Sequence, residues 1–266
     1  MRFTKSALGA VSTLFLAASS YGQTSAPAQA SAKPKSSTSS ATAAKPVAAA
    51  YDRTLLKPAL LKDKAPDTYQ VKFVTTRGEF AISVTRAWAP LGADRFYNLV
   101  KHHYFDNAHF FRVLPNFVAQ FGLSAYPAVN AAWDKATIKD DPHGQSNKKG
   151  TITFATAGPN TRTTQLFINL KDNPNLDSQG FTPFGVVDPP GMNVVEMLYD
   201  QYGDSAGMDQ DNIAKGGKKY IDQKWPRLDI IKSATIVGAA ASAPAAKPAP
   251  AKPAASTTPK PATKPQ

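Results

Sequence analysis

The sequence of 266 residues contains no cysteine. This absence excludes disulfide bonds, a thiol nucleophile, and the cysteine to which a lipid anchor would be attached. The folded part of the chain must therefore be stabilised by its core alone, even in an oxidising compartment. The middle of the chain, from Asp67 to Gly238, has about 170 residues, which is long enough to form one such core.

Acidic residues are absent from both ends of the chain. Residues 1–50 carry five lysines or arginines and residues 239–266 carry four, without an aspartate or glutamate in either range. These nine cations account for most of the formal net charge of +12 and leave 22 basic against 19 acidic residues in between. Recognition of nucleic acid would require basic residues clustered on a folded face. We therefore expect no nucleic-acid partner.

A long apolar run is also missing. The segment "ALGAVSTLFLAA" (Ala7–Ala18) is shorter than the roughly 20 residues that a membrane-spanning helix needs. It follows Arg2 and Lys5 and precedes small residues, a pattern typical of a secretory signal peptide that is cleaved near Ser20-Tyr21-Gly22. We expect residues 1–22 to be this signal, and the mature protein to be periplasmic or secreted without stable membrane insertion.

Two segments next to the expected core lack aromatic residues. Residues 23–50 and 239–266 consist mainly of Ala, Pro, Ser, Thr and Lys. Such segments cannot bury enough apolar surface to offset the entropy lost on ordering. The composition therefore predicts disordered linkers at 23–66 and 239–266 on either side of one folded domain at 67–238.

The middle of the chain shows the periodicity of strands and helices. "YQVKFVTTRGEFAISV" (Tyr69–Val84) alternates apolar and polar residues and breaks at Arg77-Gly78, which predicts a β-hairpin. Helical spacing begins near Pro90 and again at Met192–Tyr202, where Val195, Met197 and Leu198 are expected to face the core. Further strands are predicted at Gly150–Thr156, Gln165–Leu170, Phe181–Val187 and Leu228–Val237. Many short strands with two helices indicate a closed or nearly closed β-barrel.

The stretch "HFFRVLPNFVAQFG" (His109–Gly122) resembles a buried strand but contains Arg112 and Gln120. Burying an unpaired polar group costs roughly 1–3 kcal/mol, and more for a charge, so these side chains need partners. Alternation along a strand places Arg112 with Phe110 and Leu114 rather than with Phe117. Periodicity alone therefore does not predict a pocket, and an arginine in a strand most often faces solvent.

Four segments are more specific than this periodicity. "FFRVLPNFVAQFG", "GTITFATAGPNTRTTQLFINL", "NLDSQGFTPFG" and "GMNVVEML" follow one another in an order that resembles the core motifs of the cyclophilin-type peptidyl-prolyl cis–trans isomerases. The resemblance covers roughly Tyr69–Val237. It implies an eight-stranded antiparallel β-barrel capped by two α-helices, prolyl isomerase activity, no cofactor or metal, proline-containing polypeptide clients and a monomer.

The resemblance also assigns roles to individual positions. Arg112 matches the catalytic arginine, and Gln120 matches the glutamine that binds the substrate backbone and orients the arginine. The matched motifs imply substrate binding by Phe117, Val118, Ala155, Thr156, Ala157, Gln165, Leu166, Phe167, Leu176 and Phe181.

Several positions depart from the family motifs. Asn175 stands where many eukaryotic members have a tryptophan that contacts cyclosporin, Thr156 replaces a frequent asparagine, and Phe181 a frequent histidine. We expect these differences to change drug sensitivity and substrate preference more than catalysis. The segment Ser124–Lys149 is expected to be an elaborated surface loop, with His143 exposed.

Two alternative functions remain open for the sequence. One is a binding module that keeps the proline pocket but has little turnover, although the presence of both Arg112 and Gln120 argues against it. The other is attachment to the cell envelope through the basic tails, with the isomerase domain as a passenger.

Overall fold

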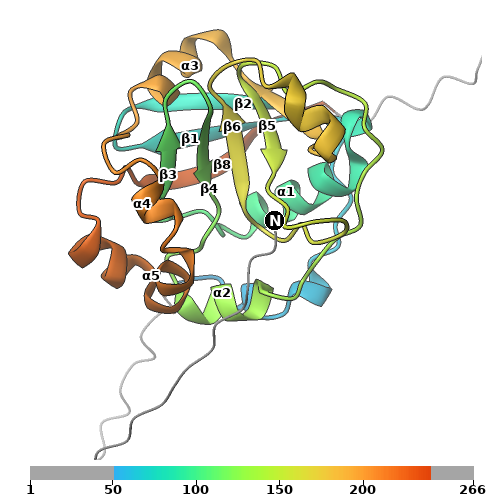
Figure 1. Ribbon diagram of the computed structural model, residues 1–266. Coiled ribbons are helices and arrows are strands. Elements are labelled where there is room, and N and C mark those ends of the chain that lie inside the picture. The colour runs from blue at the N-terminus through green and yellow to red at the C-terminus, as the bar shows by residue number, and fades with distance from the viewer. Residues whose placement is uncertain (1–50, 241–266) are drawn as a thin grey trace, which may run out of the picture. The chain divides into compact units, whose positions relative to one another are not determined.

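The computed structural model describes residues 51–240, and the expected signal peptide and most of the expected linker residues lie outside this range. Eight strands form one antiparallel sheet in the order β3-β4-β6-β5-β7-β2-β1-β8 (Figure 1). Their bounds are β1 Thr68–Thr75, β2 Glu79–Thr85, β3 Arg112–Leu114, β4 Val118–Phe121, β5 Thr151–Phe154, β6 Leu166–Asn169, β7 Pro183–Val187 and β8 Ile231–Ala240. The predicted eight-stranded antiparallel architecture is confirmed.

The sheet curls so that its two edges meet at one end. The segment before β3 bonds to the start of β8, with Asn107 N donating to Ile231 O at 2.8 Å and Phe110 N donating to Asp229 O at 3.0 Å. His109 and Ile230 form an antiparallel bridge between these bonds. The contact satisfies backbone groups that an open edge would leave unpaired, which makes the sheet a barrel at this end.

The barrel interior is filled by one face of each strand. The predicted hairpin at Tyr69–Val84 is confirmed as β1 and β2, and Val71, Phe73, Ile82 and Val84 point inward with 0–1% exposure. Phe73 stacks on Phe80 with ring centroids 5.0 Å apart. Because side chains alternate along a strand, the residues between these are free to face outward.

Two helices pack on the barrel as expected. Helix α1 (Pro90–Lys101) contacts β7 and β8, and its Phe96, Leu99 and Val100 are buried. Helix α3 (Pro189–Glu196) packs on β2, at the top of Figure 1. This second helix is shorter than predicted because it ends at Glu196. Leu198 is buried beyond the helix end, whereas Met197 is 55% exposed, so its expected place in the core is wrong.

The segment expected to be an elaborated surface loop contains a helix with one buried face. Helix α2 (Pro127–Trp133) carries Trp133, which is 1% exposed and donates from Nε1 to Leu55 O at 2.8 Å. Its partner segment forms two short 3₁₀ helices at Arg53–Leu56 and Pro58–Leu60. The folded unit therefore begins before the expected boundary at residue 67, because Leu55 gives this segment an apolar anchor. His143, further along the same loop, is exposed as predicted.

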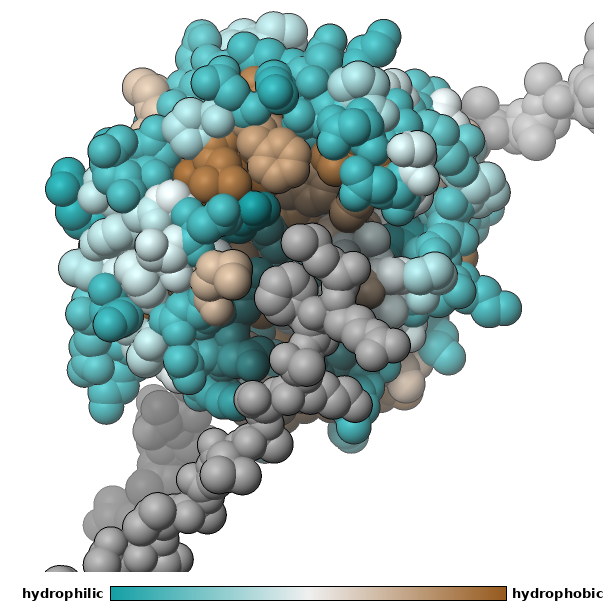
Figure 2. Space-filling model, in the orientation of Figure 1, coloured by the Kyte–Doolittle hydropathy of each residue, from teal (hydrophilic) through white to brown (hydrophobic). Residues whose placement is uncertain are grey.

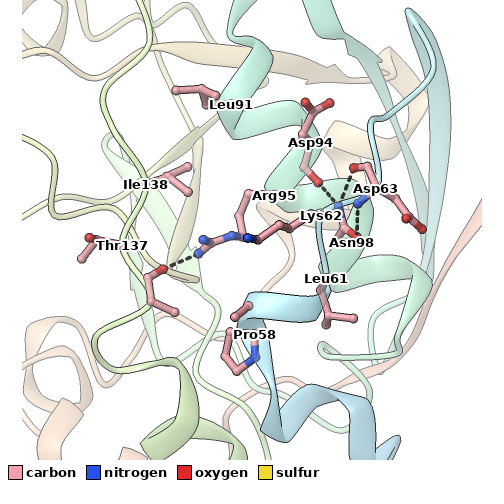
Figure 3. A pocket seen from close by; sticks show the side chains of 12 residues that line it. Pro58, Leu61, Lys62, Asp63, Leu91, Asp94, Arg95, Asn98, Thr137 and Ile138 are labelled. Carbon is pink, nitrogen blue, oxygen red and sulfur yellow. Dashed lines mark hydrogen bonds between the residues drawn. The ribbon is translucent and has the colours of Figure 1, made fainter.

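The segment 58–63 continues along α1 (Figure 3). Asn98 donates from Nδ2 to the backbone oxygens of Asp63 at 2.7 Å and Asp94 at 2.8 Å, and it accepts from Asp63 N at 3.1 Å. A cavity of about 390 Å³ remains between this segment, α1 and residues 136–138. Arg95 crosses it and donates to the carbonyl oxygens of Ala136 and Thr163 at 2.7 and 2.8 Å, which ties α1 to two loops.

Two further helices follow α3 and were not predicted. Helix α4 (Asp204–Gly207) lies next to β3, and α5 (Gln210–Lys224) packs on α2 (Figure 1). None of the helices within residues 51–240 combines the length and the apolar composition that crossing a bilayer requires.

His109 is buried where the barrel edges meet, and this position predicts a pH-dependent stability. Burial, together with the nearby Lys218, lowers the pKa of the imidazole to about 4, although Asp222 and Asp229 oppose the shift. A histidine in the unfolded chain has a pKa of about 6.5. Between these two values only the unfolded chain binds the proton, so stability falls as the pH falls. We expect the protein to be about 2 kcal/mol less stable at pH 5 than at pH 7 from this group.

Urea unfolding at both pH values measures this difference in the wild type and in His109→Gln. The substitution should remove most of the loss between pH 7 and pH 5, whatever it does to the stability at pH 7. His143→Gln is the matched control because His143 is exposed. An unchanged pH dependence in His109→Gln would contradict the assignment.

Candidate active site

An apolar cavity of about 190 Å³ opens on the outer face of the barrel. In Figure 2, brown apolar side chains gather in a hollow near the β3–β4 hairpin and β6, with teal polar side chains around them. Val118, Phe167 and Leu176 form the buried part of this apolar cluster, which is separate from the barrel core. The cavity is lined by Arg112, Phe117, Val118, Gln120, Ala155, Thr156, Phe167, Leu176 and Phe181.

Strand alternation decides which side chains reach the cavity. On β3 and β4, Val113 and Ala119 belong to the barrel core, whereas Arg112, Val118 and Gln120 face outward. The register pairs Arg112 with Gln120, and Gln120 with Phe167. A row across three neighbouring strands therefore presents a guanidinium, an amide and an aromatic ring to the same cavity.

The β3–β4 turn brings Phe117 to the face that carries Arg112. Phe117 N donates to Leu114 O at 3.0 Å, and Asn116 has a φ of 59°, a left-handed conformation that asparagine tolerates better than most residues. The Cζ atom of Arg112 lies 5.7 Å from the centroid of the Phe117 ring, within the range of a cation–π contact. Strand periodicity could not predict this contact because the turn, and not the strand, places Phe117.

Arg112 is held by two polar partners on different elements. Its Nε donates to Asp204 Oδ1 at 2.5 Å, and its Nη1 donates to Gln120 Oε1 at 3.4 Å. Gln120 in turn donates from Nε2 to Gln165 Oε1 at 2.9 Å. A guanidinium has five N–H donors, so these contacts orient Arg112 and leave donors for a further ligand. Arg112 and Gln120, the two polar residues of an otherwise apolar stretch, therefore both have hydrogen-bond partners.

The far wall of the cavity comes from β6 and the 3₁₀ helix η4 (Pro174–Gln179). Phe167 and Phe181 form an edge-to-face pair with centroids 5.5 Å apart. Leu176 is 6% exposed, and its carbonyl oxygen accepts a hydrogen bond from Phe181 N at 3.3 Å. Asn175, next to Leu176, is exposed. The wall is thus apolar in its depth and polar at its rim.

Three predicted substrate-binding residues do not line the cavity. Leu166 is 0% exposed and belongs to the barrel core, because it points to the opposite side of β6 from Phe167. We therefore correct its assignment from substrate binding to core packing. Ala157 and Gln165 instead border an adjacent hollow of about 370 Å³. Ala155 and Thr156 line both this hollow and the cavity.

Two acidic residues at the site were not predicted from the sequence. Asp204 pairs with Arg112, and Asp134 borders the adjacent hollow together with Gln210. Asp204 and Gln210 come from the α4–α5 segment, and Asp134 follows α2. An acidic residue far from Arg112 in the chain carries no signal that the two side chains meet, so the sequence held no pattern that could have found this pair.

The fold and the site define a β-barrel protein that presents a charged donor at the edge of a small apolar cavity on its outer face. Residues 70–217 match the profile of the family described as "Cyclophilin type peptidyl-prolyl cis-trans isomerase/CLD". A peptidyl-prolyl cis-trans isomerase of Acinetobacter baylyi is 31% identical over 167 residues, which cover 61% of this chain and 88% of the relative. The peptidyl-prolyl cis-trans isomerase ppi1 of Schizosaccharomyces pombe is 34% identical over 122 residues, with 44% and 77% covered.

A crystal structure of a cyclophilin type peptidyl-prolyl cis-trans isomerase from Cryptosporidium parvum aligns with a TM-score of 0.47 and 21% identity, over 64% of this chain and 98% of the other. On the family match and the relatives, the chain belongs to the cyclophilin-type peptidyl-prolyl cis–trans isomerases. It is accordingly an enzyme that accelerates rotation about Xaa–Pro peptide bonds.

Leu166 points into the barrel core, whereas the cavity residues point outward. Substitutions on the two sides therefore test which residues belong to the site. Leu166→Ala should cost about 2–5 kcal/mol of stability, because it removes a fully buried side chain from the core. The folded variant should keep kcat/KM for an Xaa–Pro peptide within about twofold. Phe117→Ala should do the reverse, with at least a tenfold loss in kcat/KM and a small change in stability, since its ring is only half-buried.

Urea unfolding and a peptide isomerisation assay measure both variants, and each serves as the control for the other. A stable Leu166→Ala variant with weakened peptide binding would return Leu166 to the substrate site.

Proposed function

We propose that the protein isomerises Xaa–Pro bonds in exported polypeptides, and that Arg112 stabilises the twisted amide above the apolar cavity. The observation that carries this proposal is the position of the guanidinium, which lies beside the Phe117 ring at the cavity edge and bonds to Gln120. Proline-containing polypeptides are the substrates of the family to which the chain belongs.

The reaction requires stabilisation of the twisted Xaa–Pro amide, and no covalent bond is made or broken. Rotation about an Xaa–Pro bond breaks amide resonance and has a barrier of about 18–20 kcal/mol, so the unassisted reaction takes tens to hundreds of seconds. In the twisted state the proline nitrogen regains a lone pair. A donor aimed at that nitrogen binds the twisted state better than either planar isomer, and differential binding of this kind accelerates a reaction.

Arginine has the chemistry that this step requires. Its guanidinium stays protonated at all physiological pH values and offers several donors in a fixed plane. Asp204 and Gln120 hold that plane in place from two sides. We infer that the remaining N–H groups of Arg112 donate to the proline nitrogen and to the neighbouring carbonyl oxygen of the substrate.

The cavity suits the proline ring that the reaction must hold still. Phe117, Val118, Phe167 and Leu176 supply apolar walls, and a pyrrolidine ring is apolar and has no N–H group to satisfy. Packing against these walls fixes the ring while the preceding residue rotates. Positioning of this kind removes much of the entropic cost of reaching the transition state.

Among residues 155–157, the backbone of Thr156 is suited to bind the substrate beside the cavity. Ala155 N donates to Gln165 O at 2.9 Å, and Ala157 N donates to Thr161 Oγ1 at 2.9 Å. The donors of these two residues are therefore occupied, and we assign pairing with an extended substrate to the backbone of Thr156. The side chain of Thr156 turns back into its own loop, where Oγ1 lies 2.8 Å from Thr161 Oγ1.

The N-terminal pattern is the basis for placing this activity outside the cytoplasm. Arg2 and Lys5, the apolar segment Ala7–Ala18 and the small residues after it have the order of a cleaved secretory signal. We propose a periplasmic or secreted monomer that assists the folding of exported proteins and has no nucleic-acid partner.

The mechanism is tested by Arg112→Ala. Loss of a charge-assisted hydrogen bond of about 1.5–3 kcal/mol in the transition state predicts at least a tenfold loss in kcat/KM. The melting temperature should change little, because the guanidinium is paired at the surface rather than in the core. The control is Arg53→Ala, which removes an exposed arginine far from the cavity. Near-native turnover in Arg112→Ala would exclude this mechanism and leave a different catalytic group to be found.

Export is tested separately by expressing the full chain in a Gram-negative bacterium. We expect the protein in the periplasm or the medium, with a mature N-terminus near residue 23 when the intact mass is measured. Replacing Leu14 and Leu16 in the apolar segment by aspartate should retain the uncleaved chain in the cytoplasm. Cleaved protein from this variant would contradict the signal.

A further inference from the structure

The segment after α3 packs against the catalytic strand as a small unit with its own apolar core. Phe111, Ala206, Ile213, Ile221 and Leu228 are buried together, and Tyr202 and Trp225 pack around them. Phe111 directly precedes Arg112 in the chain, so the residue next to the catalytic arginine is anchored in this core. Helix α4 is thereby held beside β3 (Figure 1).

Helix α4 lies directly on the side-chain stem of Arg112. A Cβ atom added to Gly207 would be 2.7 Å from Arg112 Cδ and 2.9 Å from its Cγ, both closer than non-bonded carbon atoms approach. Gly207 is not among the glycines with a positive φ, so its backbone conformation does not require glycine. Glycine is needed here because a larger residue would collide with the Arg112 side chain. The backbone of α4 therefore packs directly against the side-chain stem of Arg112.

From this position α4 presents a carboxylate to the guanidinium. Asp204 Oδ1 accepts from Arg112 Nε at 2.5 Å, across 92 positions in the sequence. The bond uses the Nε donor, while Gln120 on β4 accepts from Nη1 at 3.4 Å. Two acceptors on two elements define both the plane of the guanidinium and its rotation about the Cδ–Nε bond.

The backbone that carries Asp204 is held by hydrogen bonds within the same segment. Met208 N donates to Asp204 O at 2.8 Å, which closes the α4 turn. The next acid, Asp209, accepts from Tyr220 Oη at 2.8 Å and from Trp225 Nε1 at 2.9 Å. These bonds tie the end of α4 to α5, so Asp204 stands on a braced turn and not on a free loop.

We propose that Asp204 is a positioning residue for the isomerase reaction, and that the α4–α5 segment delivers it to Arg112. This inference rests on the proposed role of Arg112. The side chain of Asp204 is 56% exposed, and exposed ion pairs contribute little to stability. The contribution of this pair is therefore the orientation of the guanidinium, which places the other donors toward the proline nitrogen before the substrate twists.

Kinetics of three substitutions at Asp204 test the proposal on a short Xaa–Pro peptide. Asp204→Asn and Asp204→Ala should lower kcat about three- to tenfold with KM within about twofold, because the cavity that binds proline is untouched. Asp204→Glu should recover part of the loss, since it restores a carboxylate. The melting temperatures of all three should stay within a few degrees of the wild type.

Two further variants separate orientation from charge. Asp211→Asn makes the same charge change on an exposed acid of α5 and should leave kcat unchanged. Gly207→Ala keeps every charge but displaces the Arg112 stem, and it should lower kcat to a similar extent as Asp204→Asn. Addition of Asp204→Asn to Arg112→Ala should have no further effect, because the residue acts only through the arginine.

Failure of this proposal can be told apart from failure of the proposed mechanism. If Arg112→Ala loses activity while Asp204→Asn keeps the wild-type kcat, only the positioning role is overturned. If Arg112→Ala keeps its activity, the mechanism itself is overturned. A higher kcat in Asp204→Asn would show that the carboxylate restrains Arg112 against the reaction, and an equal loss in Asp211→Asn would reduce the effect to general electrostatics; either result rejects the positioning role.

Discussion

A positive charge at the edge of an apolar cavity must be partly removed from water and yet remain paired, and the site is organised around this constraint on Arg112. The strand β3 supplies the arginine, β4 supplies Gln120, the hairpin turn supplies Phe117 and α4 supplies Asp204. Each contact replaces part of the hydration that the guanidinium loses. The proposed mechanism transfers no proton and depends on the direction in which the Arg112 donors point.

The barrel makes this arrangement possible because β4 and β6 each serve two apolar clusters. Ala119 and Leu166 fill the interior, while Val118 and Phe167 line the cavity on the other side of the same two strands. The aromatic core keeps the strands in register, and the register keeps Arg112, Gln120 and Phe167 in one row. The barrel core and the proposed site therefore occupy opposite faces of the same strands.

The additions to the barrel act at different distances from the cavity. Residues 51–66 and α2 bury Leu55 and Trp133 against each other and do not line the cavity. The α4–α5 segment instead reaches β3 and contacts Arg112 through Asp204 and Gly207. Residues outside the barrel thus contact the arginine without lining the cavity.

The sequence by itself indicated a β-barrel through strand alternation, and the resemblance of motifs such as "FFRVLPNFVAQFG" implied the family and most of the cavity wall. Local patterns also indicated Arg112 and Gln120 as polar residues in need of partners. Only the tertiary structure decided that Leu166 belongs to the core, that Trp133 anchors residues 51–66, and that Asp204 binds Arg112 across 92 positions. The physical reason is that periodicity records which face a residue takes within its own element, whereas contacts between distant elements depend on how those elements pack.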